Sequence, residues 1–191
     1  VEMKVGNANG VSDGTVTGSI HVDKTIFDFT PYMRGLTDNS SKEWAVDGTK
    51  QGHMACGEGP DNPSGWWNGE PGCKEAEGVY DNILTFAYTD SQTSGSYNFN
   101  PGSAGTFYVN TGINSLPGYE VNNPGNGQDF RVNATEMVTT FALVPEGANL
   151  YLTLPPNTPF PYVPSEAAFA NPKYRICLLY TSDAADDRIS V

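Results

Sequence analysis

The sequence predicts an all-β protein, an antiparallel β-sandwich of jelly-roll-like type, followed by an extended Pro-rich C-terminal segment. Three observations support this fold class. Apolar and polar residues alternate with a period of two along much of the chain, as strands with one buried face require. The 191 residues include 21 Gly and 14 Pro, and Gly- and Pro-containing turn signals separate several of the short strands. No window keeps the apolar stripe of an amphipathic helix for three turns.

The first strands are expected between turn signals. Residues 15–23 alternate in polarity directly after the turn signal Asp13-Gly14. Residues 79–89 are apolar on both faces, which is typical of a strand in the middle of a sheet. Two shorter strands are expected at 105–110 and 128–133, where Asn, Pro and Gly turns bound the apolar positions.

The clearest element is a β-hairpin. Residues 136–144 alternate in polarity, and 149–154 return with leucines on one face and Tyr and Thr on the other. Pro145-Glu146-Gly147 supplies the turn, because Pro presets φ and Gly accepts positive φ. One helix of one or two turns is expected at 165–170, where Ser165 can cap the first turn.

These elements divide the chain into a β-sandwich domain at 1–154 and a Pro-rich segment at 155–176. Prolines recur from Pro155 to Pro172 and favour an extended course. One interpretation is a linker toward a further module. The alternative is a strap held along the sheet by Phe160, Tyr162 and Val163.

The last residues, 177–191, are set aside from this reasoning. Their core, CLLYTSDAAD, resembles one reading frame of a sequencing adaptor translated into protein, as occurs at the ends of open frames from environmental DNA. We therefore expect a non-native tail. The chain also starts at Val1, which fits either a removed signal peptide or a fragment.

Composition restricts the partners and suggests a compartment. The formal net charge is −12, so the chain would repel nucleic-acid phosphates and anionic membranes. Nothing approaches the roughly 18 consecutive apolar residues of a membrane span. Asn, Thr, Ser, Gly and Tyr are plentiful and Lys is scarce, which favours a secreted or cell-surface protein.

Cysteine usage supports the same compartment. With Cys177 set aside, Cys56 and Cys73 remain as a pair. A disulfide between them would close a loop rich in Gly and Pro and stabilise the fold by about 3 kcal/mol. The sequence therefore predicts a Cys56–Cys73 disulfide, against the alternative of two free thiols.

The loop between these cysteines is the strongest candidate binding site. It carries Trp66 and Trp67, with Asp61, Asn68 and Glu70 close in sequence. Indole faces suit the apolar side of a sugar ring, and carboxylates and amides bind its hydroxyls. The pattern predicts a carbohydrate site, against the alternative that one or both indoles fold inward as a small core.

Metal and catalytic signals are weak. Calcium needs only oxygen ligands, and three loops offer them: Asp38-Asn39, Asp61-Asn62 and Asp81-Asn82. No complete calcium-loop motif and no nucleophile elbow occurs, so no cofactor is assured and no catalytic residue is assigned.

Three functional hypotheses follow. The first is a secreted or surface binding module, most readily for glycans. The second is a structural or adhesive module of an envelope, filament or virion, whose partner is a neighbouring surface protein. The third is a polysaccharide hydrolase or lyase that uses a pair of carboxylates, ranked lowest because the chain shows no catalytic motif.

Overall fold

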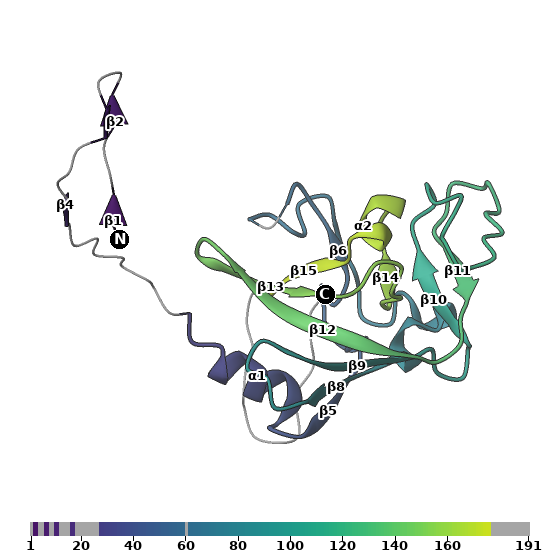
Figure 1. Ribbon diagram of the computed structural model, residues 1–191. Coiled ribbons are helices and arrows are strands. Elements are labelled where there is room, and N and C mark those ends of the chain that lie inside the picture. The colour runs from purple at the N-terminus through teal and green to yellow at the C-terminus, as the bar shows by residue number, and fades with distance from the viewer. Residues whose placement is uncertain are drawn as a thin grey trace.

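Six antiparallel strands form the main sheet. The structure is a computed structural model that describes residues 27–59 and 61–176 in full, with the backbone of four two-residue strands before residue 18. Across the main sheet the order is β15 (Lys173–Ile176), β13 (Asn149–Thr153), β12 (Met137–Glu146), β9 (Ser94–Asn100), β8 (Ile83–Tyr88) and β5 (Ser41–Trp44). Every neighbouring pair is antiparallel. The sheet curls strongly, and the long strand β12 runs across it (Figure 1).

A smaller sheet lies at one end of the main one. Its strands are β11 (Phe130–Asn133), β10 (Thr106–Val109) and β14 (Tyr162–Val163), in that order. β10 pairs antiparallel with β11 but parallel with β14. The all-β, sandwich-like fold class is therefore confirmed, with one parallel pair that the sequence did not predict.

Aromatic side chains join the two sheets into one core. Phe86, Phe99 and Phe141 project from the main sheet and are fully buried. Phe107, from β10, meets Phe99 edge to face with ring centroids 6.4 Å apart, and Phe169 stacks on Phe107 at 6.2 Å. Burial of each such ring contributes about 1.5–3 kcal/mol relative to exposure, so these rings supply much of the cohesion between the sheets.

The predicted hairpin is confirmed, and it is longer than expected. Pro145 and Glu146 pair with Leu150 and Asn149, so the turn predicted at Pro145-Glu146-Gly147 is wrong in its first two residues. These belong to β12, and the turn consists of Gly147 and Ala148. β9 pairs with β12 only as far as Ala142, so β13 is the one strand bonded to β12 at Pro145. A proline, which lacks an N–H, is tolerated there because no strand pairs with β12 on its other side at this position.

The strand expected at 79–89 is central, as predicted, but shorter. Its first residues form a 3₁₀ helix, η2 (Val79–Asp81), which follows η1 (Glu75–Glu77). β8 then lies between β5 and β9, and its buried residues alternate along the strand.

The Pro-rich segment runs along both sheets. Phe160 and Val163 are buried, and the two residues of β14 pair with Tyr108 and Val109. The predicted helix is present as α2 (Glu166–Ala170), and Ser165 accepts the N–H of Ala168 at 3.1 Å. β15 then adds itself to the edge of the main sheet beside β13.

One helix was not expected, namely α1 (Thr30–Thr37), which contacts β5 and β8. Ahead of it, β1 (Glu2–Met3) pairs with β4 (Val16–Thr17), and β2 (Gly6–Asn7) pairs with β3 (Gly10–Val11). The strand expected at 15–23 lies outside the described residues except for the backbone of β4, and the adaptor-like tail at 177–191 lies outside them entirely.

Candidate functional site

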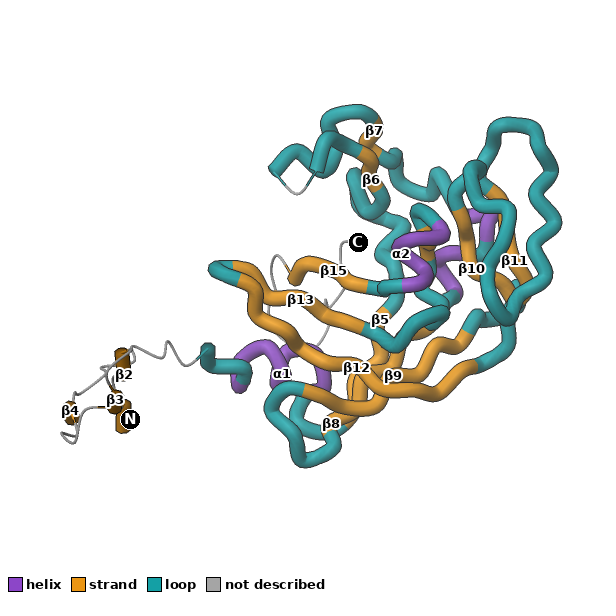
Figure 2. The backbone as a smooth tube through the Cα atoms, turned by 45° about the horizontal axis from the view of Figure 1, so that its top comes forward, coloured by secondary structure: helices purple, strands orange, loops and turns teal. Residues whose placement is uncertain are grey.

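A short hairpin carries the residues that the sequence singled out. It consists of β6 (Ala55–Cys56) and β7 (Trp67–Asn68), and it projects beyond the main sheet (Figure 2). At its open end Gly69 donates to the carbonyl of Met54 at 2.9 Å. Nε2 of Gln51 donates to the carbonyl of Asn68 at 3.2 Å, so the preceding turn holds this strand in place.

Both indoles of the hairpin are exposed. Trp66 is 68% exposed and Trp67 is 41% exposed, although large aromatic side chains usually bury most of their surface. The expectation that one or both indoles form a small core is therefore not met. The two indoles are consecutive in the chain, and exposed side chains of this size are candidates for ligand contact.

The other three predicted site residues are exposed but not gathered together. Asn68 follows Trp67 directly in β7. Asp61 lies in the loop at the closed end of the hairpin, and Glu70 follows β7 at the open end. The two carboxylates therefore do not belong to one end of the hairpin, and Asn68 is the predicted polar residue nearest the indoles in the chain.

The predicted disulfide is not formed: Cys56 and Cys73 are both free thiols, and both are exposed. Cys56 lies in β6 opposite Trp67, whereas Sγ of Cys73 lies 3.1 Å from the position that a Cβ on Gly69 would take. Gly69 pairs with Met54, two residues before Cys56. The Cys73 thiol thus lies near the level of Met54, about two strand residues from Cys56, and its Sγ lies 3.8 Å from Nε2 of His53 instead.

Lys74 connects the hairpin to the smaller sheet, a role that the sequence did not reveal. Its Nζ lies 5.6 Å from the ring centroid of Trp67 and 4.9 Å from that of Tyr108. Nζ also donates to the hydroxyl of Tyr108 at 3.0 Å, and the Tyr108 ring lies 5.8 Å from that of Tyr162. We call these four residues, Trp67, Lys74, Tyr108 and Tyr162, the Trp–Lys–Tyr cluster; Tyr108 is buried in it.

Burial, hydrogen bonds and nearby charges set the protonation states of Lys74 and the tyrosines in the Trp–Lys–Tyr cluster. The hydroxyl of Tyr162 donates to Asp129 at 3.1 Å and accepts from Asn110 at 3.3 Å. Burial raises the pKa of Tyr162 to about 12, with Asp129 adding to the shift. Burial alone would lower the pKa of Lys74, but its hydrogen bond to Tyr108 and the nearby negative charges raise it. At neutral pH the phenols are therefore neutral and Lys74 is a cation.

Several carboxylates accept hydrogen bonds from loop residues and so hold these loops in place. Asp81 accepts from the backbone and side chain of Ser103 at 2.9 and 2.7 Å. Asp129 accepts the N–H of Thr111 at 2.9 Å. Glu166 accepts the N–H groups of Asn114 and Ser115, each at 3.0 Å. These bonds give the three carboxylates a structural role.

The three loops expected to offer calcium ligands are spread through the fold. Asp38 caps the end of α1 with φ of 49°, Asp61 lies in the exposed hairpin loop, and Asp81 ends η2. In the described part of the chain, no three Asp, Glu, His or Cys side chains lie together as metal ligands would. Calcium binding thus remains a prediction that rests on the acidity of the chain.

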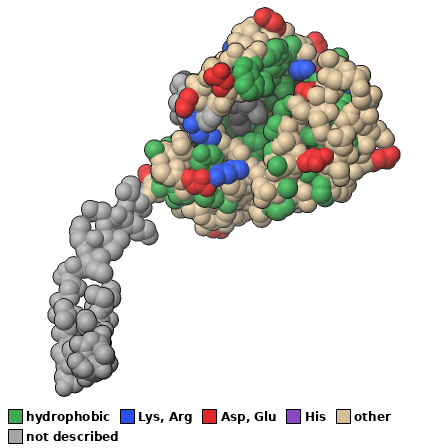
Figure 3. Space-filling model, turned by 90° about the horizontal axis from the view of Figure 1, so that it is seen from above, with side chains coloured by type: hydrophobic (Ala, Val, Ile, Leu, Met, Phe, Trp, Pro, Cys, Tyr) green, Lys and Arg blue, Asp and Glu red, His purple; other side chains and the backbone are tan. Residues whose placement is uncertain are grey.

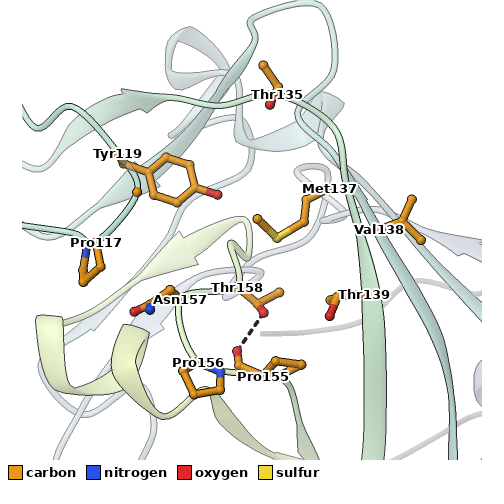
Figure 4. A pocket seen from close by; sticks show the side chains of 11 residues that line it. Pro117, Tyr119, Thr135, Met137, Val138, Thr139, Pro155, Pro156, Asn157 and Thr158 are labelled. Atoms are coloured by element: carbon orange, nitrogen blue, oxygen red, sulfur yellow. Dashed lines mark hydrogen bonds between the residues drawn. The ribbon is translucent and has the colours of Figure 1, made fainter.

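Two open grooves accompany these features. One, of about 600 Å³, lies beside the hairpin base and is lined by Pro71, Gly72, Glu75 and Tyr80 among others. The other, of about 450 Å³, lies between β12 and the start of the Pro-rich segment. There Tyr119 and Met137 face one another, and Thr158 donates to the carbonyl of Pro155 at 2.7 Å (Figure 4).

The face seen from above has hydrophobic side chains around a hollow, with acidic side chains dispersed near the rim (Figure 3). Within the described residues, no helix combines the length and apolar character needed to cross a membrane. Comparison of the chain with models of known protein families and with curated protein sequences finds no match.

Proposed function

We propose that this protein is a secreted or cell-surface β-sandwich binding module that holds a carbohydrate against the β6–β7 hairpin. The observation that carries the proposal is the exposure of two adjacent indoles, Trp66 at 68% and Trp67 at 41%, on a hairpin that projects from the sheet. An indole face covers the apolar side of a sugar ring, and each such contact costs little conformational entropy because the side chain has few rotatable bonds.

Polar groups around the indoles suit the hydroxyls of a sugar. The Asn68 amide follows Trp67, and Gln51 contacts the backbone of Asn68 from the neighbouring turn. Lys74 lies over the Trp67 ring and adds a donor at neutral pH. A small-ligand site typically combines an apolar side chain, here an exposed indole, with a few polar groups that orient the ligand.

The adhesive hypothesis has less support. Assembly through sheet edges requires edge strands that accept a neighbour, yet both edges of the main sheet carry charge. β5 holds Lys42 and Glu43, and β15 holds Lys173 and Arg175. Charged side chains on edge strands oppose pairing with another chain, so the binding role is favoured.

Localisation remains part of the proposal and rests on composition. Cys56 and Cys73 do not support it, because both are free thiols. The abundance of Asn, Ser, Thr and Tyr and the scarcity of Lys are the remaining support.

The test is retention on immobilised polysaccharides and a glycan array. We expect Trp66→Ala and Trp67→Ala each to weaken binding by about tenfold, which corresponds to about 1.4 kcal/mol, while circular dichroism stays unchanged. Val138→Ala is the matched control, because Val138 is an exposed apolar side chain at 69% that lies away from the hairpin. A wild-type protein that retains no glycan, or indole variants that bind as well as wild type, would overturn the proposal.

A further inference from the structure

A buried histidine lies at the base of the hairpin with a fixed tautomer. His53 is 2% exposed, and its Nδ1 lies 2.7 Å from the carbonyl oxygen of Lys50. A carbonyl oxygen can only accept, so Nδ1 carries the proton in the neutral ring. Nε2 therefore presents a lone pair, which is the state that a proton acceptor requires.

Two donors converge on that lone pair. The hydroxyl of Tyr80 lies 2.7 Å from Nε2, and Sγ of Cys73 lies 3.8 Å from it. The Tyr80 hydroxyl accepts the N–H of Lys74 at 2.8 Å and points its own proton at Nε2, so it competes with the Cys73 thiol for the single lone pair. Burial raises the pKa of Tyr80, the bond from Lys74 lowers it, and the charge of Cys73 raises it again, so this hydroxyl remains a donor at neutral pH.

Cys73 is also within reach of solvent. It is exposed, and it follows Gly72, whose φ of 74° turns the chain at that point. The 600 Å³ groove lies next to this segment and is lined by its neighbours Gly72 and Glu75, although not by Cys73 itself. The thiol therefore has a base on its inner side and access for a small molecule on its outer side, and a cation, Lys74, is the next residue.

We propose that Cys73 and His53 form a thiol–imidazole pair that makes Cys73 a site of exchange with small disulfides. Nε2 of His53 takes the thiol proton as the Tyr80 hydroxyl gives up its hydrogen bond to that lone pair, and the thiolate attacks one sulfur of the small disulfide. That S–S bond breaks as the bond to Cys73 forms, and the leaving thiolate takes the proton back from His53. The sulfur of Cys73 is oxidised, and one half of the small disulfide is reduced to a thiol.

The second cysteine provides a matched control within the chain. Cys56 is likewise free and exposed, and it lies in β6 opposite Trp67, whereas His53, the one histidine of the described residues, lies against Cys73. Cleavage after Glu58 places the two cysteines on different peptides, so mass spectrometry can follow each thiol separately in the full chain.

The experiment measures alkylation by iodoacetamide and mixed-disulfide formation with neutral 2-hydroxyethyl disulfide at pH 7. We expect Cys73 to react on the order of tenfold faster than Cys56, since exposed thiols without a base are only a few per cent thiolate at this pH. In urea the two rates should converge, because unfolding separates Cys73 from His53. His53→Gln should slow Cys73 to the rate of Cys56 and leave Cys56 unchanged.

Equal rates for the two cysteines in the native protein would overturn the proposal, and this comparison needs no variant. A rate ratio that persists in urea would also overturn it, because the advantage would then come from local sequence. An internal Cys56–Cys73 disulfide as the main product would do the same. Each outcome is independent of whether the hairpin binds glycans.

Discussion

The hydroxyl of Tyr97 donates a hydrogen bond of 3.0 Å to the carbonyl of Pro159, 62 residues further along the chain. Tyr97 lies in β9, in the middle of the main sheet, and is fully buried. Pro159 and Phe160 belong to the Pro-rich segment and are also buried. A polar contact thus fixes this segment inside the core, where apolar packing alone would leave its position less defined.

We expect Tyr97→Phe to lower the free energy of unfolding by about 1–2 kcal/mol, because it leaves the buried Pro159 carbonyl without its donor. Urea denaturation followed by circular dichroism measures the change. Tyr88→Phe is the control, since its hydroxyl only accepts a 3.4 Å bond from Gln92 at the surface. Equal stability of the two variants would contradict a structural role for the Tyr97 bond.

Asn82 makes a second buried connection, between the start of β8 and the start of β10. Its Nδ2 donates to the carbonyls of Pro101 and Thr106, both at 3.0 Å, and the residue is 0% exposed. We expect Asn82→Ala to cost about 2–4 kcal/mol, because two buried carbonyls lose their donor and a small void remains. Asn122→Ala, at an exposed position, should change the urea midpoint little.

The contrast between predicted and missed elements has a physical cause. The β12–β13 hairpin has strict alternation and a turn at Gly147 that needs positive φ, and α2 has a capping serine, so local sequence suffices for both. β9 reads SGSYNFN, and its pattern is legible only once Gly95 is recognised as a buried position. α1 has no side-chain cap at its N-terminus, so its helical start has no sequence signal of that kind.

The candidate site shows the same limit. The sequence led us to expect at least one partly exposed indole in the loop, and the structure exposes both. Lys74, Tyr108 and His53 were not predicted, because their roles come from contacts between segments far apart in sequence, such as the 34 residues between Lys74 and Tyr108. The same contacts place Cys73 beside His53 rather than beside Cys56, which spacing in the chain could not reveal.

We expect a side chain at position 95 to cause a severe packing defect. A Cβ at this position would lie 2.3 Å from the carbonyl oxygen of Ala87 and 2.5 Å from Cε1 of Phe141. Gly95→Ala therefore forces the β8–β9–β12 ladder apart or shifts the Phe141 ring, at a cost of about 1–3 kcal/mol or more. Thermal unfolding measures the loss. Ser96→Ala, next in the same strand, should be nearly neutral because it removes only a 3.4 Å contact.

We expect deprotonation of Tyr162 to lower the stability of the folded protein in alkaline solution. Burial, with the charge of Asp129, raises its pKa from 10.0 to about 12 in the folded protein. The folded state therefore keeps this proton where the unfolded chain releases it, so the contribution is fully present below pH 10.0 and is lost as the pH rises toward about 12. Other buried tyrosines shift in the same direction, so the wild-type urea midpoint should fall steeply across this window.

Tyr162→Phe removes one of these groups, and its midpoint should fall less over the same range, although it starts lower because the bond to Asp129 is gone. If the variant lost as much stability as wild type between these two pH values, the protonated Tyr162 hydroxyl would not stabilise the fold.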